Sequence, residues 1–76
     1  MAEGKVDWKA VGRRVRELRG LYTKQKDFAK SVGVSQNYLS VIEHGKAEVG
    51  AAVLLRIGRV GGKSLEWLLT GDERES

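Results

Sequence analysis

The side chains with the clearest chemical potential lie in the stretch SQNYLSVIEHGK, residues 35–46. Gln36 and Asn37 are neighbouring carboxamides, and each amide can donate and accept hydrogen bonds. Such an amide pairs in a bidentate manner with N6 and N7 of adenine in the major groove of DNA. Ser40 suits either kind of base edge, and Val41 suits the methyl group of thymine. These residue types therefore offer recognition of base edges.

The polar side chains of this stretch share one face if the stretch is helical. At about 100° per residue, an arc of roughly 140° contains Gln36, Asn37, Ser40, Val41 and His44. Leu39 and Ile42 then point inward. A solvated helix surface is the plainer interpretation, but such a surface is usually filled with Lys and Glu. The amides on this face therefore favour contact with DNA bases.

Charge and length support an anionic partner. The chain has 76 residues, which suits one domain, and its 14 Lys and Arg against 10 Asp and Glu give a formal net charge of +4. Half of the acidic residues lie close to the two ends of the chain: Glu3, Glu66, Asp72, Glu73 and Glu75. Residues 5–63 are therefore clearly basic, and an anion is expected to bind there.

Composition argues against several other classes of protein. There is no cysteine and one histidine, so no disulfide framework, metal site or cofactor is expected. Paired carboxylates, a nucleophile beside a base, and a phosphate-cradling loop are also missing, so we do not expect an enzyme. No apolar run approaches the roughly 20 residues of a membrane span, and the start lacks a signal-peptide pattern. The sequence predicts a cytoplasmic protein without membrane contact.

Apolar residues recur at helical spacing through almost the whole chain, which predicts an all-α domain. Five helices are expected, at residues 8–19, 24–32, 36–44, 49–60 and 65–70. The fourth contains AAVLLRIGRV and is expected to be the central, buried helix. Helix-capping residues precede the other four, namely Asp7, Thr23, Ser35 and Ser64. Residues 7–71 should form the domain, after a flexible N-terminus at 1–6 and before a disordered tail or linker at 72–76.

The apolar stripes of all five helices predict one core. Its members are Val15, Leu18, Phe28, Ala29, Val32, Val34, Leu39, Ile42, Leu54, Ile57, Leu65 and Leu68. The connection between the second and third helices is too short for antiparallel packing, so these two helices should cross steeply around Gly33. That geometry is a helix-turn-helix.

The chain from Val11 to Gly71 resembles the phage-repressor-like (Xre-type, lambda-repressor-like) helix-turn-helix family. The matching segments are VGRRVRELRG, QKDFAKSVGVSQNYLSVIEHGK and LLRIGRVGGKSLEWLLTG. The resemblance implies a compact five-helix fold with the helix-turn-helix in helices two and three. It also implies that the third helix lies in the major groove of double-stranded DNA, and that a homodimer binds a near-palindromic operator.

Individual roles follow from the same resemblance. Base contacts are expected from Gln36, Asn37, Ser40 and Val41, with Ser35 at their edge. Phosphate contacts are expected from Gln25, Tyr38, His44 and Lys46. Arg16 and Glu43 match a partly buried ion pair that joins the first helix to the third. The dimer contacts are expected at Leu65, Glu66 and Leu69. The homodimer is expected either in free solution or only when the protein is bound to DNA.

Two functions stay open at this point. The first is a sequence-specific transcriptional regulator that acts as a repressor. The chain would then be either the complete regulator or the N-terminal domain of a longer protein. The second is an antitoxin-like or other protein-interaction module, in which DNA binding is autoregulatory and a protein partner is the main target. They differ in whether the isolated chain binds an operator at physiological salt.

Overall fold

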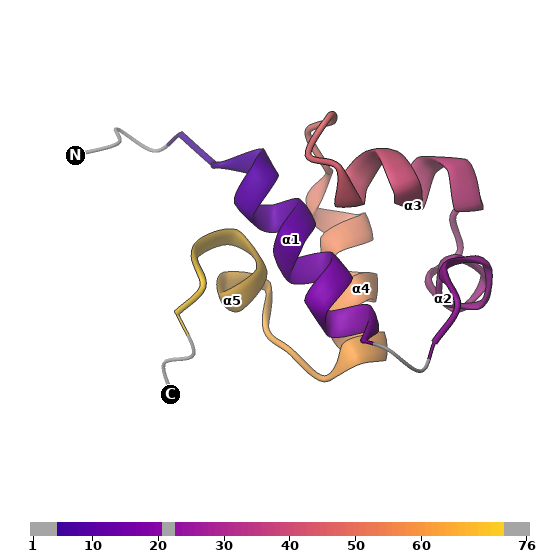
Figure 1. Ribbon diagram of the computed structural model, residues 1–76. Helices are drawn as coiled ribbons and strands as arrows, with labels where there is room; N and C mark the ends of the chain where they lie inside the picture. The colour runs from indigo at the N-terminus through magenta and orange to yellow at the C-terminus, as the bar shows by residue number, and fades with distance from the viewer. Residues whose placement is uncertain (1–4, 21–22, 73–76) are drawn as a thin grey trace.

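The computed structural model describes residues 5–20 and 23–72. Within these residues the chain forms five helices and no strand, which confirms the predicted fold class. Figure 1 labels them as α1 (Trp8–Arg19), α2 (Gln25–Val32), α3 (Gln36–Glu43), α4 (Ala51–Gly61) and α5 (Leu65–Thr70). Much of the predicted flexible N-terminus and tail, at residues 1–4 and 73–76, lies outside the described residues. Among the described helices, none has both the length and the apolar character to cross a membrane.

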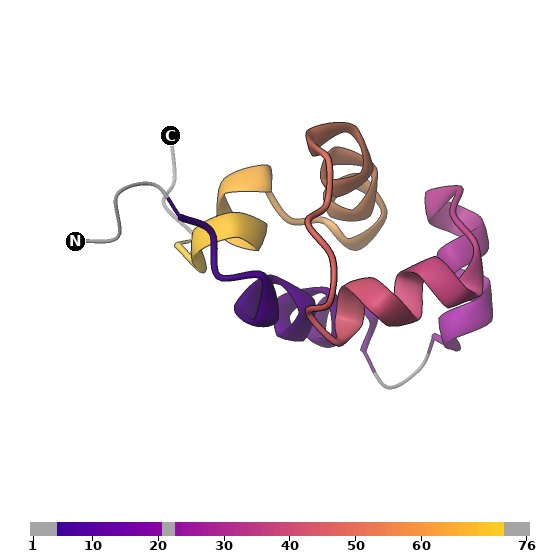
Figure 2. The ribbon, with the colours of Figure 1, turned by 90° about the horizontal axis from the view of Figure 1, so that it is seen from above.

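Helix α1 contacts α3, α4 and α5, and α4 in turn contacts α1, α2 and α5. In Figure 1 α1 crosses the centre of the molecule, with α5 on one side and the α2–α3 pair on the other. Figure 2 shows α4 on the far side of α1 and α3. The prediction that residues 49–60 form a central, buried helix is wrong as to its burial, because half of α4 faces solvent and Leu55 and Val60 are 42% and 45% exposed.

The predicted core is confirmed. Nine of its twelve members are buried, and the remaining three, Leu18, Val34 and Leu65, are half-buried and pack against the others. Val11, Val49 and Trp67 complete the same cluster. Val49 does so from the loop before α4, because that helix begins two residues later than predicted, behind Gly50. One core thus joins all five helices.

Helix caps fix where α1, α3 and α5 begin. The Asp7 carboxylate accepts a hydrogen bond from the Ala10 amide at 3.1 Å, and the Ser35 hydroxyl accepts one from the Tyr38 amide at 3.0 Å. Ser64 caps α5 in the same way. The predicted Thr23 cap is wrong, since α2 begins at Gln25 behind Lys24, without a side-chain cap. The Thr23 carbonyl instead accepts a hydrogen bond from Arg19.

Two glycines let α1 and α3 approach backbone to backbone. A Cβ atom at Gly12 would lie 2.5 Å from the carbonyl oxygen of Ile42, and one at Gly45 would lie 2.6 Å from Cα of Lys9. Both distances are far shorter than real carbon contacts. Gly45 also has a φ of 70°, which side-chain-bearing residues rarely adopt. Glycine at these two positions therefore allows α3 to pack closely against α1.

Candidate nucleic-acid interface

The face of α3 that the sequence assigned to base contacts is turned away from the core. Leu39 and Ile42 on the inner side of α3 are buried. On its outer side Ser35, Gln36, Asn37 and His44 are exposed, while Ser40 and Val41 are half-buried. Figure 1 shows α3 at the edge of the molecule, free along one side. The five residues predicted to contact bases thus lie at the N-terminal end and on the outer side of one helix.

Gln25 lies beside this face. It is the first residue of α2, and its side-chain oxygen accepts a hydrogen bond from Nε2 of Gln36 at 3.3 Å. Gln25, Gln36, Asn37 and Ser40 line one shallow depression. The structure therefore brings one predicted phosphate contact together with three predicted base contacts. The depression is built from the first turn of α2 and the outer side of α3.

A buried carboxylate determines the direction of these amide hydrogen bonds. Nε2 of Gln25 donates to Oε1 of Glu43 at 3.1 Å. An ionised carboxylate only accepts hydrogen bonds, so Gln25 must turn its NH₂ group toward Glu43 and its oxygen toward Gln36. Gln36 must then present its own NH₂ group to Gln25. We call this chain of hydrogen bonds from Glu43 through Gln25 to Gln36 the amide relay.

Arg19 holds the carboxylate at the inner end of the amide relay. Its Nε and Nη2 atoms bond the two oxygens of Glu43 at 2.7 and 2.9 Å, a bidentate pair. The Glu43 side chain is only 3% exposed and that of Arg19 is 16% exposed. The hydrogen bonds that the Arg19 guanidinium donates to Glu43, together with the negative charge of Glu43, raise the pKa of Arg19 above its ordinary value, against the opposing effect of desolvation. The arginine therefore stays charged.

The predicted pair of Arg16 with Glu43 is wrong in its arginine, because Arg19 makes the contact and Arg16 is exposed. Gly12 marks the line along which α1 touches α3. Seven residues later, Arg19 lies about 20° from that line on the side of the core, whereas Arg16 lies about 40° away on the side of solvent. The sequence did not distinguish Arg19 from Arg16, because the line of contact through Gly12 is known only from the structure.

The other predicted phosphate contacts lie toward the C-terminal end of α3 and its flank. His44 and Lys46 are exposed and Tyr38 is half-buried. Nδ1 of His44 lies 2.8 Å from the carbonyl oxygen of Ser40. A carbonyl can only accept, so Nδ1 carries the hydrogen, which leaves Nε2 for an outside partner. The amide of Lys46 donates to the carbonyl of Val41 at 3.1 Å, which fixes the start of the following loop.

The predicted dimer contacts lie apart from these residues. Leu65 and Leu69 are half-buried and Glu66 is exposed on α5, which Figure 1 places on the opposite side of α1 from the helix-turn-helix. Arg14 of α1 donates to the carbonyl of Leu68 at 2.9 Å, and the Lys63 ammonium lies 5.0 Å from the centre of the Trp67 ring. The first contact fastens the short α5 to α1, and the second joins α5 to the link that precedes it.

Comparison with known proteins identifies this arrangement. The P22 c2 repressor, solved in complex with a synthetic operator, is 33% identical with a TM-score of 0.76, over 82% of this chain and 96% of that chain. The clp gene regulator ClgR from Corynebacterium glutamicum is 27% identical with a TM-score of 0.76, over 86% and 70% of the two chains. The N-terminal DNA-binding domain of SinR from Bacillus subtilis is 26% identical with a TM-score of 0.75, over 90% and 99%.

The comparison with curated proteins found no match. A model of the helix-turn-helix family matches residues 13–68, which include all the residues of the amide relay. The match covers most of the chain, and the solved structures agree with it in fold. This protein therefore belongs to the lambda-repressor-like (Xre-type) helix-turn-helix family of DNA-binding regulators.

Proposed function

We propose that this protein is a transcriptional repressor that binds a near-palindromic operator as a dimer and reads each half-site with α3 in the major groove. Family membership supports DNA binding and transcriptional regulation. The finer proposal is carried by one observation, the exposed amide of Gln36 at the outer end of a relay that begins at a buried carboxylate. A solvated surface amide has no need of such support.

The amide relay leaves Gln36 the groups that adenine requires. One hydrogen of its NH₂ group is used by Gln25. The second hydrogen can bond N7 of adenine while the side-chain oxygen accepts from N6, which is the bidentate pairing expected for an amide. Because the relay fixes the rotation of the amide, Gln36 meets the base without first losing rotational freedom. Asn37, Ser40 and Val41 follow on the same side of α3 and read neighbouring base pairs.

Phosphates on both sides of the groove hold α3 in place. Gln25 retains a second N–H beyond the one that it donates to Glu43, and it lies at the first turn of α2, where free backbone amides also favour an anion. His44 and Lys46 provide donors near the other end of α3, and Tyr38 adds its hydroxyl. Such contacts fix register and supply affinity that falls with salt, but they carry no sequence information.

The dimer extends this reading to two half-sites. One domain contacts few base pairs, and a two-fold dimer matches the symmetry of a near-palindromic operator. Leu65 and Leu69 leave apolar surface on α5, with Glu66 between them. We place the two-fold axis beside this helix, with association that is weak in free solution and completed on DNA.

The test is operator selection from a random duplex library with the full chain, followed by titration of the selected duplex and of a random duplex. We expect a consensus with two symmetric half-sites and tighter binding to it than to random DNA. Gln36→Ala should weaken binding to the selected duplex and leave binding to random DNA nearly unchanged. Equal losses on both duplexes would contradict base reading by α3.

The second function, a protein-interaction module, has one observation in its favour. Leu55 and Val60 of α4 are the large apolar side chains that are exposed among the described residues. Operator binding that appears only after a protein partner is added would support this function. Specific binding by the isolated chain at physiological salt would support the repressor.

A further inference from the structure

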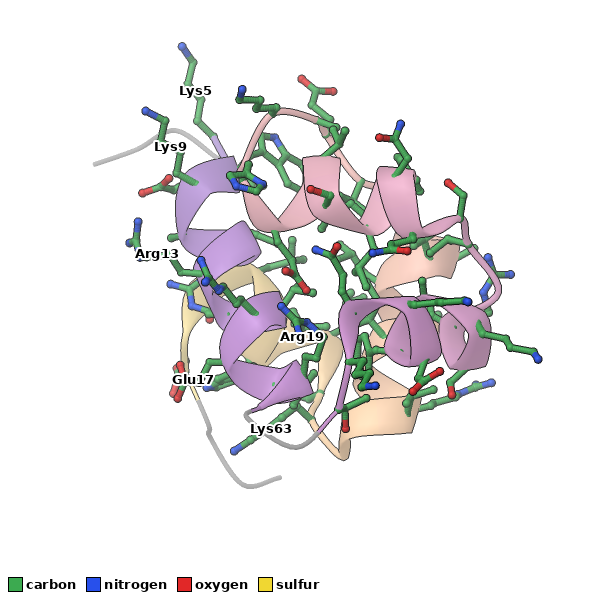
Figure 3. All side chains as sticks on the ribbon, turned by 45° about the vertical axis from the view of Figure 1, so that its right-hand side comes forward. Lys5, Lys9, Arg13, Glu17, Arg19 and Lys63 are labelled. Carbon is green, nitrogen blue, oxygen red and sulfur yellow. The ribbon has the colours of Figure 1, made fainter. Side chains whose placement is uncertain are left out.

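A row of cations follows the outer side of α1 and has no role in the interface described above. Lys9, Arg13 and Arg16 are exposed, at spacings of four and three residues, and Lys5 continues the row before the helix begins. We call these four residues the α1 row. Figure 3 shows Lys5, Lys9 and Arg13 following one another along the outer edge of α1, while Arg19 on the same helix points inward. The row therefore faces solvent on one side of the helix.

Position links the α1 row to the DNA-reading surface. The turn that ends α3 rests on the backbone of Lys9, where a Cβ atom on Gly45 would lie 2.6 Å from Cα. His44 and Lys46, on either side of Gly45, are proposed phosphate contacts. Around the axis of α1, the nearest exposed side chain of the row, Arg16, lies about 40° from Gly12, which touches α3, and on the solvent side of it. The row thus continues directly from the C-terminal end of α3 onto α1.

No ion pair among the described residues includes a member of the α1 row, although carboxylates lie near both of its ends: Asp7 and Glu48 close to Lys5, and Glu17 one turn beyond Arg13. The ion pair found among the described residues joins Arg19 to Glu43. Glu17, the carboxylate next along the exposed side of α1, lies past Arg13 and Arg16 toward the C-terminal end of the helix. Lys9 and Arg13 are separated by four residues, or about 6 Å of helix, while phosphates of one DNA strand follow one another every 3.4 Å or so along its axis. Flexible side chains at that spacing can reach successive phosphates.

We propose that the α1 row binds the DNA backbone and continues the track of phosphates that begins at His44 and Lys46. This inference rests on the proposed function. The N-terminal half of α1, which carries Lys9 and Arg13, is on the same side of the molecule as α5 and away from the α2–α3 turn in both ribbon views (Figures 1 and 2). With the two-fold axis beside α5, the row lies over the backbone between the two half-sites. It adds affinity and fixes the distance between half-sites, but it reads no base.

The experiment compares Lys9→Gln and Arg13→Gln with a matched control, Arg59→Gln. Arg59 is exposed on α4, which lies on the far side of α1, and its substitution removes the same charge. Each variant is titrated across salt on the selected operator and on a random duplex. We expect each α1 variant to lower the slope of log affinity against log salt by about 0.9 on both duplexes. Between 50 and 200 mM salt, that change makes the loss of affinity about threefold smaller than for the wild type. The control should match the wild type.

A second measurement locates the contacts. Single phosphates of the operator are replaced in turn by neutral methylphosphonates, and binding of each duplex is measured for the wild type and for Lys9→Gln. We expect at least one phosphate between the half-sites whose neutralisation weakens the wild type but not the variant. If the salt slopes of Lys9→Gln and Arg13→Gln equal that of Arg59→Gln, the inference is overturned and the proposed function stays intact. That result would favour an acidic protein partner for the α1 row. Coupling confined to phosphates outside the half-sites would overturn the placement. A wild-type chain that selects no operator would defeat the proposed function itself.

Discussion

Removal of the Arg19 side chain tests whether the buried carboxylate is held as the structure indicates. In Arg19→Ala, Glu43 keeps its bond from Gln25 but loses two charge-assisted hydrogen bonds in a site where its side chain is 3% exposed. Breaking a buried ion pair in this way costs about 3 to 5 kcal/mol, and we expect the lower end because one donor remains. The free energy of unfolding of a domain of this size is itself about 4 to 11 kcal/mol.

The expected loss of about 3 kcal/mol corresponds to a melting temperature lower by about 12 to 24 °C for a domain of this length. Urea unfolding followed by the fluorescence of the two tryptophans, half-buried Trp8 and buried Trp67, measures the free energy directly. Arg16→Ala is the matched control, because that arginine lies one turn away and is exposed, so its loss should cost less than about 0.5 kcal/mol. Equal effects of the two substitutions would refute the assignment of Arg19. A double-mutant cycle with Glu43→Ala should give a coupling of about 0.5 to 3 kcal/mol.

Three further outcomes are expected. Gln36→Ala should cost about 1 to 3 kcal/mol on the selected operator and relax the preference at one base pair, as measured by titration of operators with single base changes. Lys46→Ala should weaken binding to all DNA alike and lower the salt slope by about one per protomer, so a base-specific loss would argue against phosphate contact. Gly12→Ala should unfold at a lower urea concentration, because the new methyl group meets the carbonyl oxygens of Ile42 and Glu43; unchanged stability would show that α1 and α3 can separate at no cost.

Local features of the sequence predicted most of the fold. Asp7, Ser35 and Ser64 cap their helices because the capping contact spans only three residues and does not depend on the rest of the chain. The core residues were predictable for the related reason that a helix repeats its buried side every three or four residues. Thr23 failed as a cap because α2 begins at Gln25, one residue later than predicted, which places Lys24 at the cap position and leaves the Thr23 carbonyl to accept a hydrogen bond from Arg19.

Features that depend on how helices sit against one another were harder to predict. Residues 49–60 are nearly all apolar on one side, which suggested a central, buried helix, but composition does not reveal where a helix lies in the fold. The structure covers Leu54 and Ile57 and leaves Leu55 and Val60 exposed. The amide relay was missed for the same reason, since Gln25 and Glu43 are distant in sequence and meet only after α2 and α3 have packed.

Glu43 explains why one charge is kept inside so small a domain. A buried ion pair is a weak source of net stability, because desolvation offsets most of the attraction. An apolar pair could fill the same space, but it could not fix the direction of an amide. The carboxylate, by contrast, forces Gln25 and then Gln36 into one orientation of their amides, so a charge at the contact between α1 and α3 determines which hydrogen-bonding groups are offered to DNA. A substitution in α1 that never touches a base, such as Arg19→Ala, should therefore reduce base preference as well as stability.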